Sequence, residues 1–213
     1  SVVLNHLPSG KSSLTAFSGV FQYGVDLPYQ TAIQIDENGM TEQTGFRQYY
    51  NHYHCADVSL YDVKTGEMHT LLFGGIAQYY DSLGIMVQDN GVPFVRTISR
   101  VTRQPNGSMK EYKFPVEMPA LLGAGSEFIP ATELPRTASG VAIFKAGDDS
   151  LLLGTIVGGI ASTERNVFWF NDEEESAAFS GMFDVYLVKN AGAQHENTAS
   201  NSSLVLHAVR HAT

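Results

Sequence analysis

The sequence predicts an all-β protein made of repeated antiparallel sheets, and three observations support that prediction. A strand-like apolar run ends in two glycines at 71–77, and a closely similar run does so at 155–161. Asn-Gly pairs, the strongest short-range signal of a β-hairpin, lie between alternating β-rich runs. Stretches rich in Ala, Glu, Lys and Leu are almost absent, and 173–182 is the only segment with plausible helix chemistry.

The first element expected along the chain is a glycine-ended strand at 17–24, after an irregular N-terminal segment, 1–16. A hairpin follows within 28–40, where a proline and an aromatic residue precede a Thr-led β-rich run and an Asn-Gly turn. The segment 93–109 has the same arrangement. Both central residues of a type I′ turn need a positive φ, which Asn and Gly tolerate, so we expect that turn type twice. The two turns are Asn38-Gly39 and Asn106-Gly107.

The segments 58–77 and 141–161 are two copies of one unit. Each copy consists of a strand, a tight polar turn and a second strand ending in Gly-Gly. Such a unit cannot bury its own apolar face, so the copies must pack against one another. Three units fit the chain, the last of them degraded after 168–172. The repeat glycines are Gly74, Gly75, Gly158 and Gly159.

The strand closed by Gly-Gly and followed by an aromatic-containing hairpin resembles the blade of the kelch type of β-propeller. In that family the glycines end the second strand of a four-stranded sheet. The phrases 49–80 and 92–130 also resemble largely uncharacterised secreted proteins with degenerate kelch-like repeats, many of which carry a C-terminal sorting domain for type IX secretion. Two features depart from the pattern: Trp169 is the single tryptophan, and no sorting domain is visible. The resemblance implies an extracellular or cell-surface protein with a repeat domain over 17–190 and a polar tail, 191–213.

About three blades fit the chain, whereas propellers typically close with four to eight. An incomplete ring leaves apolar blade faces and strand edges exposed. We therefore expect a kelch-like β-propeller fragment. The missing blades are supplied by a longer polypeptide, by self-association, or are replaced by an open stack that the two ends of the chain cover.

Charge and cysteine content limit the partners. The formal net charge is −9 and no run of Lys or Arg occurs, which argues against binding to a nucleic-acid backbone. No apolar stretch approaches the roughly 18–20 residues of a membrane span. Cys55 is the only cysteine, so no intrachain disulfide forms. We expect a protein or glycan partner and no cofactor.

The best metal-ligand constellation is His52, His54 and Cys55. On a strand, the alternation of side chains would place the two imidazoles on one face. A closed site needs further ligands, for which His69 and Asp57 are the candidates, and no second Cys/His pair appears. The alternative is that these side chains fill a polar blade edge. We predict that they bind no metal of functional weight.

The predicted binding surface is the long link 78–91 that follows the first Gly-Gly strand, because loops at one rim of a β-repeat protein commonly carry its function. Its mixture of aromatic and acidic side chains suits carbohydrate stacking or an amphipathic protein contact. The alternative is that the tyrosines seal one blade against the next. The residues concerned are Tyr79, Tyr80, Asp81 and Asp89.

Two functions follow from these observations. The first is a non-catalytic binding, adhesion or scaffold module of a secreted or surface β-propeller protein. The second is a fragment of a propeller-type glycan-acting hydrolase, which needs carboxylates or histidines on innermost strands. Asp62, Glu67 and Glu127 are the candidates for that role. They lie singly or in turns, so the binding module is favoured.

Overall fold

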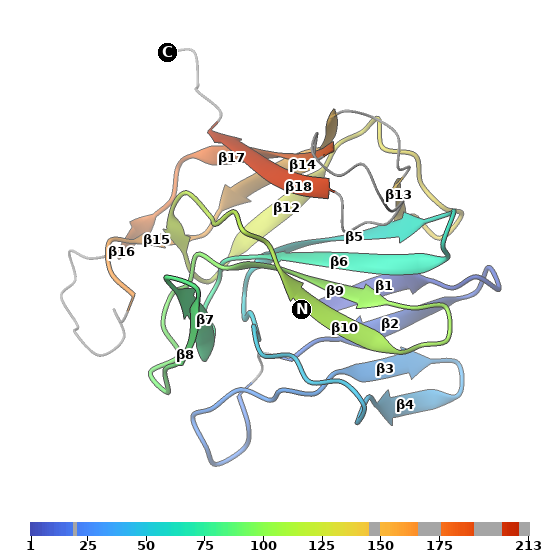
Figure 1. The fold of residues 1–213 in the computed structure, drawn as a ribbon, viewed down its shortest axis with the longest axis horizontal. Coiled ribbons are helices and arrows are strands. Elements are labelled where there is room, and N and C mark those ends of the chain that lie inside the picture. The colour runs from blue at the N-terminus through green and yellow to red at the C-terminus, as the bar shows by residue number, and fades with distance from the viewer. Residues whose placement is uncertain (19–20, 145–149, 166–175, 190–201, 209–213) are drawn as a thin grey trace.

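The computed structural model describes residues 1–18, 21–144, 150–165, 176–189 and 202–208, and all regular elements in these ranges are β-strands (Figure 1). The all-β prediction is therefore confirmed.

Three four-stranded antiparallel units dominate the molecule. The first contains β1 (Val2–His6), β2 (Ser12–Ala16), β3 (Ile33–Asp36) and β4 (Gly39–Glu42). The central unit contains β5 (Ala56–Asp62), β6 (Glu67–Phe73), β9 (Ile98–Arg103) and β10 (Met109–Lys113). The third contains β12 (Ser126–Pro130), β14 (Ser150–Gly158), β17 (Met182–Lys189) and β18 (Ser202–Ala208).

Smaller elements complete the sheets. β7 (Tyr79–Ser82) and β8 (Ile85–Gln88) form a separate hairpin. β11 (Leu121–Leu122), β15 (Ile160–Ser162) and β16 (Ser176–Ala178) form a three-stranded sheet. β13 (Ala142–Phe144) extends the central sheet by pairing with β5, the one parallel pair among the described strands. All these sheets are open, each with two edge strands.

The three four-stranded units are layered so that their first strands adjoin. β5 contacts both β1 and β12, and Figure 1 shows the central unit between the other two. Strand β6 contributes side chains to the cores on both sides of the central unit, because successive side chains point to opposite faces. Leu71 and Phe73 pack into the core shared with the third unit, whereas Leu72 packs into the core shared with the first.

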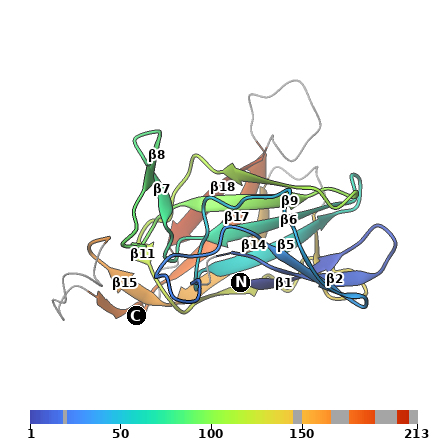
Figure 2. The ribbon, with the colours of Figure 1, turned by 90° about the horizontal axis from the view of Figure 1, so that it is seen from below.

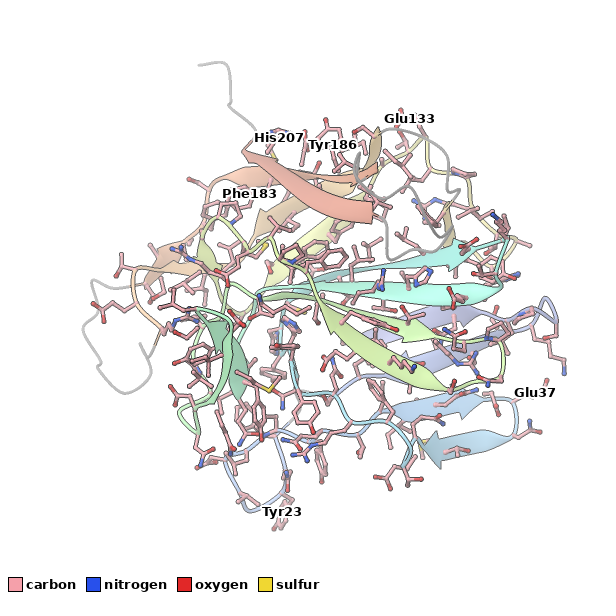
Figure 3. All side chains as sticks on the ribbon, in the orientation of Figure 1. Tyr23, Glu37, Glu133, Phe183, Tyr186 and His207 are labelled. Atoms are coloured by element: carbon pink, nitrogen blue, oxygen red, sulfur yellow. The ribbon has the colours of Figure 1, made fainter. Side chains whose placement is uncertain are left out.

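The outer side of the third unit carries fewer packed groups. Tyr186 on β17 and His207 on β18 meet edge to face there, with ring centroids 5.5 Å apart (Figure 3). The main core of the molecule therefore lies between the central and third units, with Ile156 and Val185 fully buried in it.

The repeat glycines lie at the ends of β6 and β14, the second strands of their units. Each pair directly follows or ends the second strand of its unit, β6 or β14, and all four glycines have positive φ angles between 62° and 91°. The second glycine of each pair is also crowded by residues at or just before the start of the first strand of its unit. A Cβ on Gly75 would lie 2.6 Å from the Tyr53 carbonyl oxygen, and one on Gly159 would lie 3.0 Å from Ser126. A Cβ is excluded at Gly75 and crowded at Gly159, and both positions also have a positive φ, so the sequence signal has a conformational and steric cause.

The first strand of the second repeat copy differs from the prediction. In the first copy β5 and β6 pair directly, from Ala56↔Phe73 to Asp62↔Glu67. In the second copy β13 pairs with β5, and β14 pairs with β12. The expected partner of β14 is β13, but β13 pairs with β5 instead. β12, which precedes the repeated segment, pairs with β14 in its place.

Both Asn-Gly hairpins form, but the predicted turn type is wrong. Neither Asn38 nor Asn106 has a positive φ, and only the glycine after each does. In the second hairpin Gly107 N–H donates to the Gln104 carbonyl at 2.9 Å, so Pro105 and Asn106 are the central turn residues and Gly107 follows. This is a turn followed by a glycine in the left-handed region. Proline is favoured at the first central position of such a turn.

Three boundaries also differ from the sequence prediction. Residues 1–16 are not irregular, because β1 and β2 pair from Val2↔Ala16 to His6↔Ser12 as a hairpin with alternating exposed and buried side chains. The tail 191–213 includes β18, which pairs with β17. The segment expected to have helix chemistry holds β16 over its described part, while residues 173–175 and the degraded repeat at 168–172, with Trp169, lie outside the described residues.

The described residues contain no helix of the length and apolar character that crossing a bilayer requires.

Candidate functional site

The predicted binding segment, 78–91, is a two-stranded hairpin inserted between the second and third strands of the central unit. β7 and β8 pair antiparallel, and Ser82↔Ile85 is the last pair before the turn. The hairpin stands out from the sheets in Figure 2. Its two turn residues, Leu83 and Gly84, have φ angles of 55° and 84°, which is the type I′ pattern.

The tyrosines at the base of the hairpin contact the body of the protein. Tyr79 is buried, its hydroxyl lies 3.2 Å from Gln30 Nε2, and its ring meets Tyr49 edge to face at 5.7 Å. The guanidinium carbon of Arg165 lies 4.3 Å from the centroid of the Tyr80 ring. These contacts anchor the hairpin and leave the two rings engaged within the chain.

The predicted acidic residues also have contacts within the chain. Asp81 Oδ1 accepts a 3.0 Å hydrogen bond from the Gly84 N–H and lies 3.7 Å from Lys113 Nζ. Asp89 Oδ1 accepts a 2.8 Å hydrogen bond from the Gly91 N–H. Asp81 therefore braces the turn and ties the hairpin to β10, while Asp89 shapes the return to the body.

The exposed end of the hairpin includes three large apolar residues that were not among the predicted binding residues. Leu83 is 100% exposed, Ile85 69% and Met86 45%. We refer to Leu83, Ile85 and Met86 as the hairpin tip. The signal in the sequence was the turn itself, because Ser-Leu-Gly-Ile-Met places apolar side chains where turns normally carry Asn, Asp or Gly.

The three weak metal candidates are not brought together on one strand face. Residues 52–55 precede β5 and are not part of it. His52 is buried: its Nδ1–H donates to the Gly74 carbonyl at 2.5 Å and its Nε2 accepts from Ser99 Oγ at 2.9 Å. Both ring nitrogens are thus occupied, and burial lowers the pKa of His52 to about 4.

His54 and Cys55 have different surroundings from His52. His54 is exposed, with a positive φ of 51°. Cys55 is buried, and burial raises the pKa of its thiol to about 12, so it remains protonated at neutral pH and is a poor metal ligand or nucleophile. Same-face alternation was therefore wrong for this segment, because the strand starts only at Ala56.

A cavity of about 260 Å³ opens between the start of β5 and the start of β12, and two carboxylates line it. They are Asp57 and Glu127, and His54 lies on the same wall. The pKa of Asp57 is raised, mainly by burial and also by the charge of Glu127. Glu127 is therefore placed near Asp57 and not near the other two predicted carboxylates.

Those two, Asp62 and Glu67, lie opposite each other across the β5–β6 turn, and His69 joins them. One ligand atom from each of the three side chains lies within 4.8 Å of the others. All three residues were candidates from the sequence, but His69 was expected beside His52 and His54. The register of the β5–β6 hairpin is what unites them.

Comparison with protein-family models, with curated proteins and with solved structures finds no match for this chain.

Proposed function

We propose that this chain is a non-catalytic binding module of a secreted or surface protein with kelch-like propeller architecture, and that the hairpin tip contacts a protein partner. The observation that carries the proposal is the projecting β7–β8 hairpin with its exposed apolar end (Figure 2). Large apolar side chains gathered on a projecting element are typical of interaction sites, where they bury against a partner within a polar rim.

The arrangement of sheets supports the propeller part of the proposal. Three sheets of four, five and four strands follow one another along the chain, antiparallel except for the β13–β5 pair, and the first strand of the central sheet contacts the first strands of the other two. In a propeller the first strand of each blade faces the common axis, and long links between strands emerge at the rim. The β7–β8 hairpin lies in the long link between the second and third strands of the central unit, where such a rim contact is expected in the proposed architecture.

The conformation of Leu83 supports a functional role for the hairpin tip. A leucine at positive φ is strained, and the residues normally found there are Asn, Asp and Gly. An apolar residue that is both fully exposed and strained stabilises neither the core nor the turn. Local departures of this kind cluster at functional sites.

A protein partner is favoured over a glycan. Carbohydrate stacking needs open aromatic faces, and the Tyr79 ring is buried while the Tyr80 ring is covered by Arg165. The tip itself carries aliphatic and thioether side chains, which suit an apolar pocket or groove. Asp81 beside the turn and Asp89 at the base supply the polar surroundings.

The test is a selection for ligands followed by a titration. A random peptide library displayed on phage would be panned against the purified chain, and the enriched peptides synthesised. Their affinities would be measured for the wild type and for a variant with Leu83→Ser, Ile85→Thr and Met86→Thr. We expect enriched peptides with apolar anchors and at least a tenfold loss of affinity in the variant, because each buried aliphatic side chain contributes about 1.5–3 kcal/mol.

A matched control removes exposed apolar side chains elsewhere. Tyr23 is 100% exposed at the end of its loop (Figure 3), and Ile129 on β12 is 57% exposed. The variant with Tyr23→Ser and Ile129→Thr should bind like the wild type. Equal binding by the tip variant, or an equal loss in the control, would contradict the proposed role of the hairpin.

A second candidate function, a glycan-acting hydrolase, rests on the cavity between β5 and β12. Asp57 and Glu127 come from the first strands of two neighbouring units, and the raised pKa of Asp57 suits a general acid. Incubation with a panel of aryl glycosides tests this candidate. Hydrolysis that is lost in both Asp57→Asn and Glu127→Gln would support it, and absence of turnover across the panel would count against it.

A further inference from the structure

A polar cluster lies at the far end of the central unit from the hairpin base, beside the β5–β6 turn. Asp62 ends β5 and Glu67 begins β6, so the two carboxylates face each other across a four-residue turn. His69 lies two residues further along β6 and therefore on the same face as Glu67. The three side chains bring an imidazole nitrogen and two carboxylate oxygens within 4.8 Å of one another.

The imidazole of His69 has an open nitrogen aimed at this cluster. The side chain is only 4% exposed, and its Nε2 has no hydrogen-bond partner. Its other nitrogen, Nδ1, lies 3.0 Å from Thr102 Oγ1. A buried polar atom without a partner costs free energy, so its position needs an explanation.

The distance between His69 Nε2 and Glu67 Oε2 supplies that explanation. The two atoms are 3.6 Å apart, which is within the range of an ion pair if the imidazole is protonated but too long for a hydrogen bond. Two ligand atoms that each lie about 2.1 Å from a tetrahedral zinc ion are separated by about 3.4 Å. The observed spacing therefore suits an ion between the two atoms.

We propose that Asp62, Glu67 and His69 form a binding site for a divalent transition-metal ion, with Zn²⁺ the best fit. One imidazole and two carboxylates are ligands that Zn²⁺ accepts, and three protein ligands leave a further coordination position for solvent or another group. The ion joins the last residue of β5 to the first residues of β6 and so fastens the turn between them.

The groups around the cluster orient its ligands. Asp62 Oδ1 accepts hydrogen bonds from the backbone N–H groups of Lys64 and Thr65, at 2.8 and 3.4 Å. Glu67 Oε1 accepts one from Gln104 Nε2 at 2.5 Å. With Thr102 on His69, each ligand side chain has a partner that fixes its direction, as is usual around metal ligands.

Arg100 opposes cation binding. Its charge acts on His69, and the guanidinium carbon lies 4.6 Å from the centroid of the Tyr112 ring. Arg100→Gln should therefore tighten metal binding.

The test uses the full chain, stripped of metal with a chelator and dialysed. Zn²⁺ alone is titrated by calorimetry, and thermal unfolding is followed with and without the ion. We expect one equivalent to bind and the Tm to rise with the Zn²⁺ concentration, because a ligand that binds only the folded state stabilises it by mass action. Mg²⁺ at the same concentration should have little effect, because it prefers six oxygen ligands.

Three substitutions locate the ion. His69→Gln and Asp62→Asn should abolish the Zn²⁺-dependent rise in Tm, and Thr102→Val should weaken binding about 10- to 100-fold. Glu111→Gln, which changes a buried carboxylate outside the cluster, is the matched control and should bind Zn²⁺ like the wild type. Unchanged Zn²⁺ binding in His69→Gln would overturn the assignment.

A crystal soaked in Zn²⁺ gives a readout that does not depend on the variants folding. An anomalous peak at the zinc edge should lie between Glu67 Oε2 and His69 Nε2. A peak only at His54 or another exposed side chain, or no stoichiometric binding in the titration, would refute the site.

Discussion

At the scale of single residues, the glycines show how local geometry is imposed by neighbours. Gly75 and Gly84 have nearly the same φ, 81° and 84°, yet their surroundings differ. Around Gly84 a Cβ would meet nothing within 4 Å, whereas at Gly75 it would meet both the Tyr53 carbonyl oxygen and the Cys55 side chain. Substitution of Gly84 therefore measures backbone strain alone, and substitution of Gly75 measures strain together with a steric clash.

We expect Gly84→Ala to lower the free energy of unfolding by about 1–2 kcal/mol, the cost of placing a Cβ in the left-handed region. Gly75→Ala should cost roughly 3 kcal/mol or more, because the backbone must also shift away from the new Cβ. Urea unfolding followed by tryptophan fluorescence or circular dichroism measures both. Equal costs at the two positions would show that the close approach at Gly75 is not important.

Glu111 is a second residue whose environment was not evident from the sequence. One of its oxygens, Oε2, accepts hydrogen bonds from the backbone N–H groups of Tyr49 and Tyr50 at 2.7 and 3.2 Å. The other oxygen is buried without a hydrogen-bond partner. Burial raises the pKa of Glu111 to about 7, although the two N–H groups oppose that shift.

This pKa predicts a pH-dependent stability. Folded Glu111 binds its proton up to about pH 7, whereas the unfolded carboxyl releases it near 4.5. Its stabilising contribution is therefore complete below pH 4.5 and is lost as the pH rises to 7, by up to about 3 kcal/mol. The free energy of unfolding of Glu111→Gln, relative to that of the wild type, should therefore rise by that amount between pH 4.5 and 8.

The measurement is the difference in unfolding free energy between the two proteins across this pH range. His52, whose pKa is lowered to about 4, has the opposite effect, because its stabilising contribution is lost as the pH falls. His52 is present in both proteins, so its contribution cancels in the difference. A difference that does not change with pH would contradict the raised pKa of Glu111.

At the scale of elements, the β7–β8 hairpin combines a firm base with a strained turn. A type I′ turn prefers Asn-Gly, and here its first position is Leu83. Asn tolerates a positive φ because its short polar side chain bonds locally. Leucine at this position therefore lowers the stability of the hairpin.

We expect Leu83→Asn to raise the free energy of unfolding by about 1 kcal/mol while weakening any ligand bound at the hairpin tip. Stability would be measured by thermal unfolding and binding with the peptides selected above. Leu83→Ala is the control, because it removes the apolar side chain without relieving the strain. A destabilised Leu83→Asn variant would show that the leucine packs in a way its exposure does not indicate.

At the scale of the whole molecule, the outer face of the first unit is apolar. Four side chains stand opposite one another in a row across its strands: Leu4↔Leu14, Leu14↔Ile35 and Ile35↔Met40. Met40 is 77% exposed, and Leu4 and Leu14 are each 37% exposed. Leu4, at one end of the row, borders a cavity together with residues of β5 and β13, whereas Met40 at the other end is the most exposed of the four. A repeat architecture normally covers such a face with the next unit.

We therefore expect the chain to self-associate through this face at micromolar concentration. Burial of a few hundred Å² of apolar surface is worth several kcal/mol. Sedimentation should show a dimer or larger species for the wild type and a monomer for the variant with Leu14→Lys and Met40→Lys, both with the same circular dichroism. A wild-type monomer would count against self-association through this row.

The sequence alone determined the β class, the positions of the strands that end in Gly-Gly and the two Asn-Gly hairpins, because these depend on alternation and on backbone angles that few residues adopt. It did not determine which strands pair. The apolar run at 142–144 suits either β14 or the edge of β5, and only packing in the assembled core selects β5.

The candidate sites also depend partly on the sequence and partly on the tertiary structure. Asp62, Glu67 and His69 could be named from the sequence, but their meeting depends on the β5–β6 register. The tyrosines of the predicted binding segment are held by Gln30 and Arg165, which are distant along the chain. Local chemistry therefore determined which residues could act, and tertiary contacts determined which of them remain free, because burial and long-range pairing are properties of the whole fold.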